Sequence, residues 1–201
     1  DIVIKPTWET VPDDMQGRMV VNIDPGTAFG TGMHETTQLV IKQLEKYVTP
    51  ETELLDVGTG SGILAVIAKM LGAKSIIGTD LDENAITASA ENMEANGFDP
   101  DIFKVIQGNI IDDKAVQDEV GYEKYDVVTA NILADVIMPL SKEIAQHIKL
   151  GGVFITSGII DMKEDAVKKT IMENPELEIV DVSHQGDWVS ITAVRKQTRE
   201  R

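Results

Sequence analysis

A glycine-rich turn at residues 56–62 has the sequence DVGTGSG and could hold a nucleoside-containing ligand against bare backbone. It follows the apolar pair Leu54-Leu55 and precedes an apolar stretch at 63–68, so we expect a strand, a turn and a helix in that order. Glycine has no Cβ, which lets a ligand approach the main chain closely. An ordinary strand-to-helix turn is the alternative, although three alternating glycines after an acid-ended strand make it the weaker interpretation.

The spacing of the glycines separates two kinds of nucleotide site. A dinucleotide site favours G-x-G-x-x-G, which places a pyrophosphate at the helix N-terminus. Here the third glycine, Gly62, comes one residue early, and Ile63 occupies the position expected for glycine. The pattern is similar to the first motif of the Rossmann-like methyltransferases, which bind S-adenosylmethionine. An NAD-dependent oxidoreductase or another nucleotide-binding module is the alternative from a different class, and Ile63 counts against it.

An acid also lies at the distance that a ribose-binding residue requires. The next expected strand, 75–79, ends at Asp80, about 20 residues after the turn. A carboxylate suits the two hydroxyl donors of a ribose, and such hydrogen bonds are charge-assisted. Capping of the following helix is the alternative for Asp80 together with Asp82. We assign the ribose to Asp80 and the helix start to Asp82.

The composition limits the class of protein. The 201 residues suit one domain and carry 34 acids against 18 bases, a net charge of −16. This charge argues against tight binding to a nucleic-acid backbone and favours a basic partner, although solubility alone also explains it. There are no cysteines, and the three histidines lack metal-ligand spacing, so we expect no metal. No membrane span or signal peptide is visible, which points to the cytoplasm.

Strands alternate with amphipathic helices along the chain. We therefore expect an α/β fold of the Rossmann-like doubly wound type, with a mostly parallel seven-stranded sheet and a C-terminal antiparallel hairpin strand. Residues 1–23 look like an extended linker and an edge strand. The expected strands are 54–57, 75–79, 103–107, 125–130, 153–157, 177–184 and 188–194, and the expected helices are 34–47, 62–71, 83–95, one ending at Gly151-Gly152, and 161–173.

Ligands of such sheets bind at the carboxyl ends of the strands. The glycine turn, Asp80, Gly108-Asn109 and Asn131 all fall at these ends. Gly108-Asn109 could contact an adenine, or it could form a simple turn. The agreement among four loops supports a single ligand site at this edge.

Three segments together resemble a known family. They are DPGTAFGTGMHETT at 24–37, DVGTGSGIL at 56–64 and NILA at 131–134. The combination resembles the bacterial ribosomal protein L11 methyltransferases, which are class I S-adenosylmethionine-dependent enzymes, and the likeness runs from about Asp24 to Val194. It implies cofactor contacts at Thr37, Gly58, Asp80 and Asn131. Thr59 stands where many relatives carry Cys.

The same family has an N-terminal substrate-recognition domain joined by a linker. This chain begins near that linker, so we expect residues 1–23 to be a linker or edge segment and 24–196 to be the methyltransferase domain. The N-terminal recognition domain is expected to be absent from the chain, which would then be a catalytic-domain fragment.

Methyl transfer to an amine mainly requires alignment, which can supply roughly 7–11 kcal/mol. We select Asn131 as the catalytic residue, which would orient the amine or the methionyl part of the cofactor through its side-chain carbonyl; a purely structural turn is the alternative. Main-chain atoms of Gly60 and the hydroxyls of Thr36 and Thr37 would contact the cofactor. Phe29 would cover it, unless Phe29 only fills the core.

The resemblance implies methylation of lysine side-chain and N-terminal amines of a basic large-subunit ribosomal protein, L11. S-adenosylhomocysteine would be the product of the reaction. We expect the protein to make no direct contact with nucleic acid or membrane. A methyltransferase of a different protein, a small molecule or RNA is the alternative. NILA rather than NPPY, together with the acidic charge, counts against a nucleic-acid base as the target.

Overall fold

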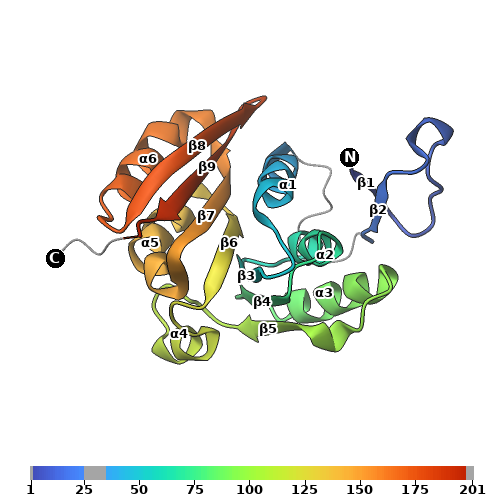
Figure 1. Cartoon of the computed structure of the whole chain (residues 1–201), viewed down its shortest axis with the longest axis horizontal. Coiled ribbons are helices and arrows are strands. Elements are labelled where there is room, and N and C mark those ends of the chain that lie inside the picture. Colours follow the sequence, from blue (N-terminus) through green and yellow to red (C-terminus); the bar gives the residue numbers. More distant parts are fainter. Residues whose placement is uncertain (1, 25–34, 198–201) are drawn as a thin grey trace.

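The computed structural model describes residues 2–24 and 35–197 (Figure 1). Seven strands form the main sheet, in the order β5-β4-β3-β6-β7-β9-β8. Their bounds are β3 (Glu53–Val57), β4 (Ser75–Asp80), β5 (Phe103–Gln107), β6 (Tyr125–Asn131), β7 (Ile148–Ile160), β8 (Leu177–Gln185) and β9 (Trp188–Arg195).

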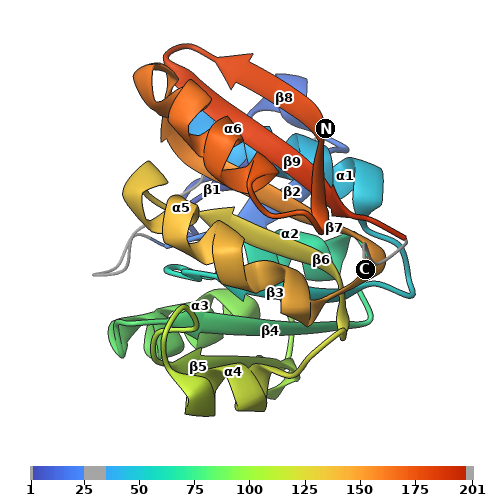
Figure 2. The same cartoon turned by 90° about the vertical axis from the view of Figure 1, so that its left-hand side faces the viewer.

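The strand order reverses between β3 and β6: β4 and β5 lie on one side of β3, and β6 and β7 lie on the other. Strands β3, β4, β5, β6 and β7 are parallel, whereas β9 runs antiparallel to both β7 and β8. Figure 2 shows the resulting order from β8 to β5. The predicted fold class is therefore confirmed, with β9 as the antiparallel strand next to the edge. Ligands of doubly wound sheets bind where the strand order reverses, which here is the carboxyl edge of β3 and β6.

Helices cover both faces of the sheet (Figure 1). On one face, α4, α5 and α6 pack on a core that includes Val128, Phe154 and Ile191. On the other face, α1, α2 and α3 pack on a core that includes Leu54, Val127 and Ile155. The helices are α1 (Glu35–Tyr47), α2 (Ile63–Met70), α3 (Asn84–Ala95), α4 (Lys114–Val120), α5 (Ala134–Glu143) and α6 (Glu164–Met172). Short 3-10 turns are η1 (Asp13–Met15), η2 (Pro100–Ile102), η3 (Ile144–His147) and η4 (Asp161–Lys163).

The segment before α1 forms a small sheet of its own. Strands β1 (Ile2–Lys5) and β2 (Met19–Asn22) pair in parallel outside the main sheet. The side chain of Asn96, at the end of α3, accepts a hydrogen bond from Asn22 N and donates one to Asn22 O, both at 2.7 Å. Asn92 accepts a third bond, from Asp24 N at 3.1 Å. Side chains of α3 therefore fasten the start of the chain to the domain.

The prediction of a helix that ends at Gly151-Gly152 is wrong about where the helix ends. Helix α5 ends at Glu143, η3 follows, and β7 already begins at Ile148, so that Gly151 and Gly152 lie inside a strand. Tyr125 pairs with Ile148 and Val127 with Val153, and the register shift between them accommodates the glycines as a bulge. The apolar spacing misled because Ile144 and Ile148 pack in one core cluster although they belong to different elements.

The sequence patterns did not predict helix α4. It has seven residues, and its buried side chains are only Val116 and Val120, too few for a periodic signal. Asp113 accepts a hydrogen bond from Ala115 N at 3.0 Å and caps its start. None of the helices formed by residues 2–24 and 35–197 combines the length and apolar character needed to span a bilayer.

Candidate active site

The glycine turn joins β3 to α2 and is fixed to the neighbouring strand β4. The amides of Gly58 and Thr59 both donate to the carbonyl of Thr79, at 2.8 and 3.1 Å. Gly58 has a φ of +74°, and a Cβ there would lie 2.6 Å from Cγ2 of Ile132, which follows β6. A side chain at position 58 would therefore collide with the end of β6, in addition to its backbone strain.

Asp80 is hydrogen-bonded to this turn. Its Oδ2 accepts from Gly60 N and its Oδ1 from Asp82 N, both at 2.9 Å. An ionised carboxylate has about four acceptor positions, so capacity remains for hydroxyl donors. Asp82 in turn accepts from Asn84 N at 2.9 Å, at the first residue of α3. The predicted ribose acid and the glycine turn thus form one hydrogen-bonded unit.

Asp56, at the end of β3, is a buried carboxyl beneath the turn. Its two oxygens accept hydrogen bonds from the hydroxyls of Thr129 (2.7 Å) and Thr59 (2.8 Å). Burial raises the pKa of Asp56 to about 6; the two hydroxyl donors lower it, and the charge of Asp80 raises it further. Asp56 therefore connects the turn, through Thr59, to β6, through Thr129.

Asn131 lies close to Thr36 and Thr37 at the carboxyl ends of β6 and β7. Asn131 Nδ2 donates to Thr37 Oγ1 at 3.1 Å, and the carbonyl of the preceding residue, Thr36, accepts from Ser157 Oγ at 2.8 Å. Both threonines are buried in the first turn of α1. The amide nitrogen of Asn131 is therefore held by Thr37, while no residue in 2–24 or 35–197 donates a hydrogen bond to its carbonyl oxygen.

Gly108 and Asn109, predicted as a possible adenine contact, form a turn after β5. Gly108 N donates to Asp80 O at 2.9 Å, while Asn109 Oδ1 accepts from Ile111 N at 3.0 Å, a contact that fits the turn interpretation. Phe29 lies outside the described residues. Across 2–24 and 35–197, no three His, Asp or Glu side chains gather in a way that could hold a metal ion.

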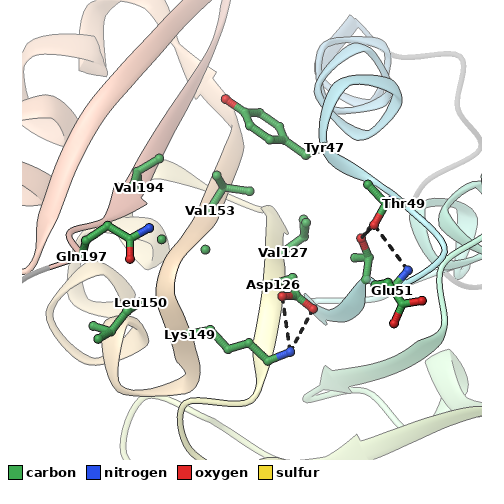
Figure 3. A pocket seen from close by; sticks show the side chains of 13 residues that line it. Tyr47, Thr49, Glu51, Asp126, Val127, Lys149, Leu150, Val153, Val194 and Gln197 are labelled. Carbon is green, nitrogen blue, oxygen red and sulfur yellow. Dashed lines mark hydrogen bonds and ion pairs between the residues drawn. The ribbon is translucent and has the colours of Figure 1, made fainter.

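A cavity of about 390 Å³ lies at the opposite edge of the sheet (Figure 3). Its walls include Thr52, which directly precedes β3, Asp126, the second residue of β6, and Val153 in β7. Lys149 Nζ lies 3.1 Å from both Glu53 and Asp126, so its charge is compensated locally. This cavity is separate from the glycine turn and from Asn131.

At the carboxyl edge of the sheet, the sequence patterns did not identify Thr129, Ser157 and Gly158. Thr129 lies inside an apolar strand and carries no motif. Ser157 and Gly158 were detectable, because a glycine inside a strand-like run often marks a bulge. The register between β7 and β9 does shift between Thr156 and Ile159.

The sequence is similar to known proteins of one family. Residues 1–196 match the family model described as Ribosomal protein L11 methyltransferase (PrmA). The chain is 62% identical to a ribosomal protein L11 methyltransferase of Lachnospira eligens, covering 98% of this chain and 62% of that protein. It is 52% identical to one of Agathobacter rectalis, covering 96% and 60%. The chain thus spans about three fifths of the length of these relatives.

Solved structures give the same result for the fold. The crystal structure of a ribosomal protein L11 methylase from Lactobacillus delbrueckii subsp. bulgaricus superimposes with a TM-score of 0.83 at 33% identity, covering 97% of this chain and 94% of that chain. A putative methyltransferase complexed with SAH has a TM-score of 0.70 at 15% identity, covering 87% and 52%, and supports the fold alone. The resemblance drawn from the three sequence segments is confirmed: the chain belongs to the ribosomal protein L11 methyltransferase family.

Proposed function

We propose that the chain is an S-adenosylmethionine-dependent protein N-methyltransferase that methylates lysine side-chain and N-terminal amines of ribosomal protein L11. Family membership supports the reaction class. The cofactor assignment depends above all on the hydrogen bond from Gly60 N to Asp80, which couples a backbone turn to a carboxylate. That pairing suits a nucleoside whose sugar offers two hydroxyls.

The residues present fit this cofactor. Gly58 and Gly60 would offer backbone, Asp80 would accept from the ribose, and Thr36 and Thr37 would contact the methionyl end. Phe29 would cover the ligand, and residues 24–196 would be the methyltransferase domain. The putative methyltransferase solved with SAH has the same fold, which is in keeping with this choice. When bound, S-adenosylmethionine supplies an activated methyl group and leaves as S-adenosylhomocysteine; no metal is required.

Asn131 would be the catalytic residue. Because Thr37 holds its amide nitrogen, its carbonyl oxygen can accept a hydrogen bond from an incoming amine. A lysine has a reference pKa of about 10.4 and must lose its proton before it can act as a nucleophile. Desolvation at the sheet edge lowers that pKa, and orientation by Asn131 supplies the alignment. Water would take the proton.

Exposed apolar side chains occur in the segments that follow β6 and β7, and they suit a protein substrate. Leu133, two residues after Asn131, is 71% exposed, and Met162 in η4 is 80% exposed. An ion pair of 3.1 Å between Lys163 and Asp135 joins η4 to the first turn of α5, next to these side chains. Exposed apolar groups of this kind can contact the aliphatic part of a lysine.

The partner would be a basic ribosomal protein, attracted over distance by the net charge of −16. No direct contact with nucleic acid or membrane is part of this proposal, and the reaction would take place in the cytoplasm. The excess of acids would slow the approach of a phosphate backbone.

Two measurements test the proposal. Titration calorimetry with S-adenosylmethionine and, separately, with NAD should give heat of binding only with the former. Binding of NAD alone would replace the methyltransferase by a dinucleotide-binding protein. Transfer of a radiolabelled methyl group to purified L11, but not to free lysine or to ribosomal RNA, should then identify the substrate. Label in the RNA or in free lysine alone would contradict a protein substrate.

A further inference from the structure

We propose that the bulge at Ser157 and Gly158 in β7 is the element that positions the Asn131 side chain. The proposal rests on the proposed function for the chemistry, but its geometry stands on three hydrogen bonds between described residues and on the space beside Gly158. Ser157 is the register partner of Asn131 in the parallel pair β6–β7. The regular pairing of β7 with β9 is interrupted directly after this point, between Thr156 and Ile159.

Gly158 leaves space that any other residue would fill. Its φ of +86° lies in the region that L side chains rarely adopt. A Cβ on Gly158 would overlap the carbonyl of Ile132 and lie 3.2 Å from Asn131 Oδ1. The glycine thus sets how far the end of β6 and the Asn131 carbonyl oxygen can approach β7.

Ser157 bonds both to α1 and to the residue that follows Asn131. Its hydroxyl donates to Thr36 O at 2.8 Å, and its carbonyl accepts from Ile132 N at 3.2 Å. Thr37, the next residue in α1, accepts from Asn131 Nδ2 at 3.1 Å. Asn131, Thr37, Thr36 and Ser157 therefore close a circuit that links β6, α1 and β7.

Bulges often occur beside active sites, where they re-aim a side chain. In this circuit Thr37 orients the amide nitrogen, Ser157 fixes the helix turn that carries Thr37, and Gly158 sets the clearance for the oxygen. Ser157 and Gly158 are positioning residues: they act through Asn131 and need not touch a ligand themselves.

The first test observes Asn131 directly. In ¹⁵N NMR spectra, the side-chain amide signals of Asn131 are identified by their loss in Asn131→Ala. Gly158→Ala and Ser157→Ala should each shift these signals. Gly97→Ala is the matched control, because Gly97 has a similar φ of +79° and open space where its Cβ would be; it should leave them in place. Unshifted Asn131 signals in both bulge variants would overturn the proposal, whether or not the chain methylates L11.

The second test is a double-mutant cycle on turnover at saturating S-adenosylmethionine. Gly158→Ala should lower methyl transfer on the order of 10²-fold, the scale of a misplaced catalytic group. In an Asn131→Ala background the same change should cost about twofold or less, as expected for residues that act as a unit. Full additivity would overturn the proposal.

Ser157→Ala provides the same cycle if Gly158→Ala does not fold, because it adds no atoms and creates no backbone strain. Its loss of turnover should likewise disappear in the Asn131→Ala background, and a loss that persists there would contradict the circuit. If the unaltered chain transfers no methyl group to L11, the proposed substrate fails, and the NMR result alone decides on the bulge.

Discussion

Gly60 and Asp80 are joined by a hydrogen bond of 2.9 Å from the Gly60 amide to Asp80 Oδ2. The bond connects the turn after β3 to the last residue of β4, so the backbone proposed to face the nucleoside and the carboxylate proposed to hold its ribose cannot move independently. Asp80 keeps its position through a second bond, from Asp82 N.

Replacing Asp80 should therefore weaken cofactor binding. We expect Asp80→Ala to reduce the affinity for S-adenosylmethionine by about 1–3 kcal/mol, the scale of hydrogen bonds to a charged acceptor. Titration calorimetry measures this loss. Asp82→Ala is the control, because its carboxylate bonds to Asn84 N and should affect α3 rather than affinity. Equal losses of affinity in Asp80→Ala and Asp82→Ala would contradict the assignment of the ribose to Asp80.

Asn131→Ala should lower turnover far more than it lowers stability. Among the residues that the structure describes, the side chain makes one hydrogen bond, to Thr37, and it is only partly buried, so the free energy of unfolding should fall by about 1 kcal/mol. Asn174→Ala is a control, since Asn174 follows the end of α6; its amide donates to Ser141 O in α5 and its Oδ1 accepts from Glu176 N, both at 3.0 Å. We expect Asn174→Ala to keep its turnover. A melting temperature that collapses together with activity in Asn131→Ala would indicate a structural role.

The buried carboxyl of Asp56 should make stability depend on pH. Its folded pKa, about 6, lies above the ordinary value of 3.8, so the folded chain keeps a proton that the unfolded chain loses. The resulting stabilisation is fully present below about pH 4 and is lost as the pH rises through 6, by about 1.4 kcal/mol for each pKa unit.

Asp56→Asn removes this titration while it keeps the shape of the side chain. Denaturant unfolding from pH 4 to 7.5 should show the unaltered chain losing stability relative to Asp56→Asn as the pH rises. A constant difference between the two proteins over this range would mean that Asp56 titrates normally.

Asn96 should control the segment before α1. Its side chain pairs with both backbone groups of Asn22, so Asn96→Ala removes two hydrogen bonds between α3 and β2. We expect faster hydrogen exchange at 19–24 with little change at β3 or β6, because local opening need not involve the main core. Uniformly faster exchange throughout the domain would contradict a local fastening.

Three strands of the main sheet were predictable because each carries a short apolar run followed by a polar residue. Leu54 to Asp56, Ile76 to Asp80 and Val127 to Asn131 follow this pattern, and the structure places those ends at one edge. The glycine turn and Asp80 were predicted as site residues on type and spacing alone. Their mutual hydrogen bond could not be, since it depends on how β3 and β4 pair.

The errors have a physical origin as well. Ile144 and Ile148 have helical spacing, yet the chain changes from η3 to β7 between them because both side chains still reach the same core. The circuit through Thr36, Thr37, Ser157 and Asn131 joins residues more than 90 positions apart. Such contacts are fixed by helix packing on the sheet and leave no local pattern in the sequence.

A crystal structure of this chain with S-adenosylhomocysteine tests the central claim most directly. We expect the ribose hydroxyls within hydrogen-bonding distance of Asp80 and the nucleoside against the backbone of Gly58 and Gly60. Ligand density at any other edge of the sheet, with Asp80 bonded only to Gly60 and Asp82, would contradict the claim.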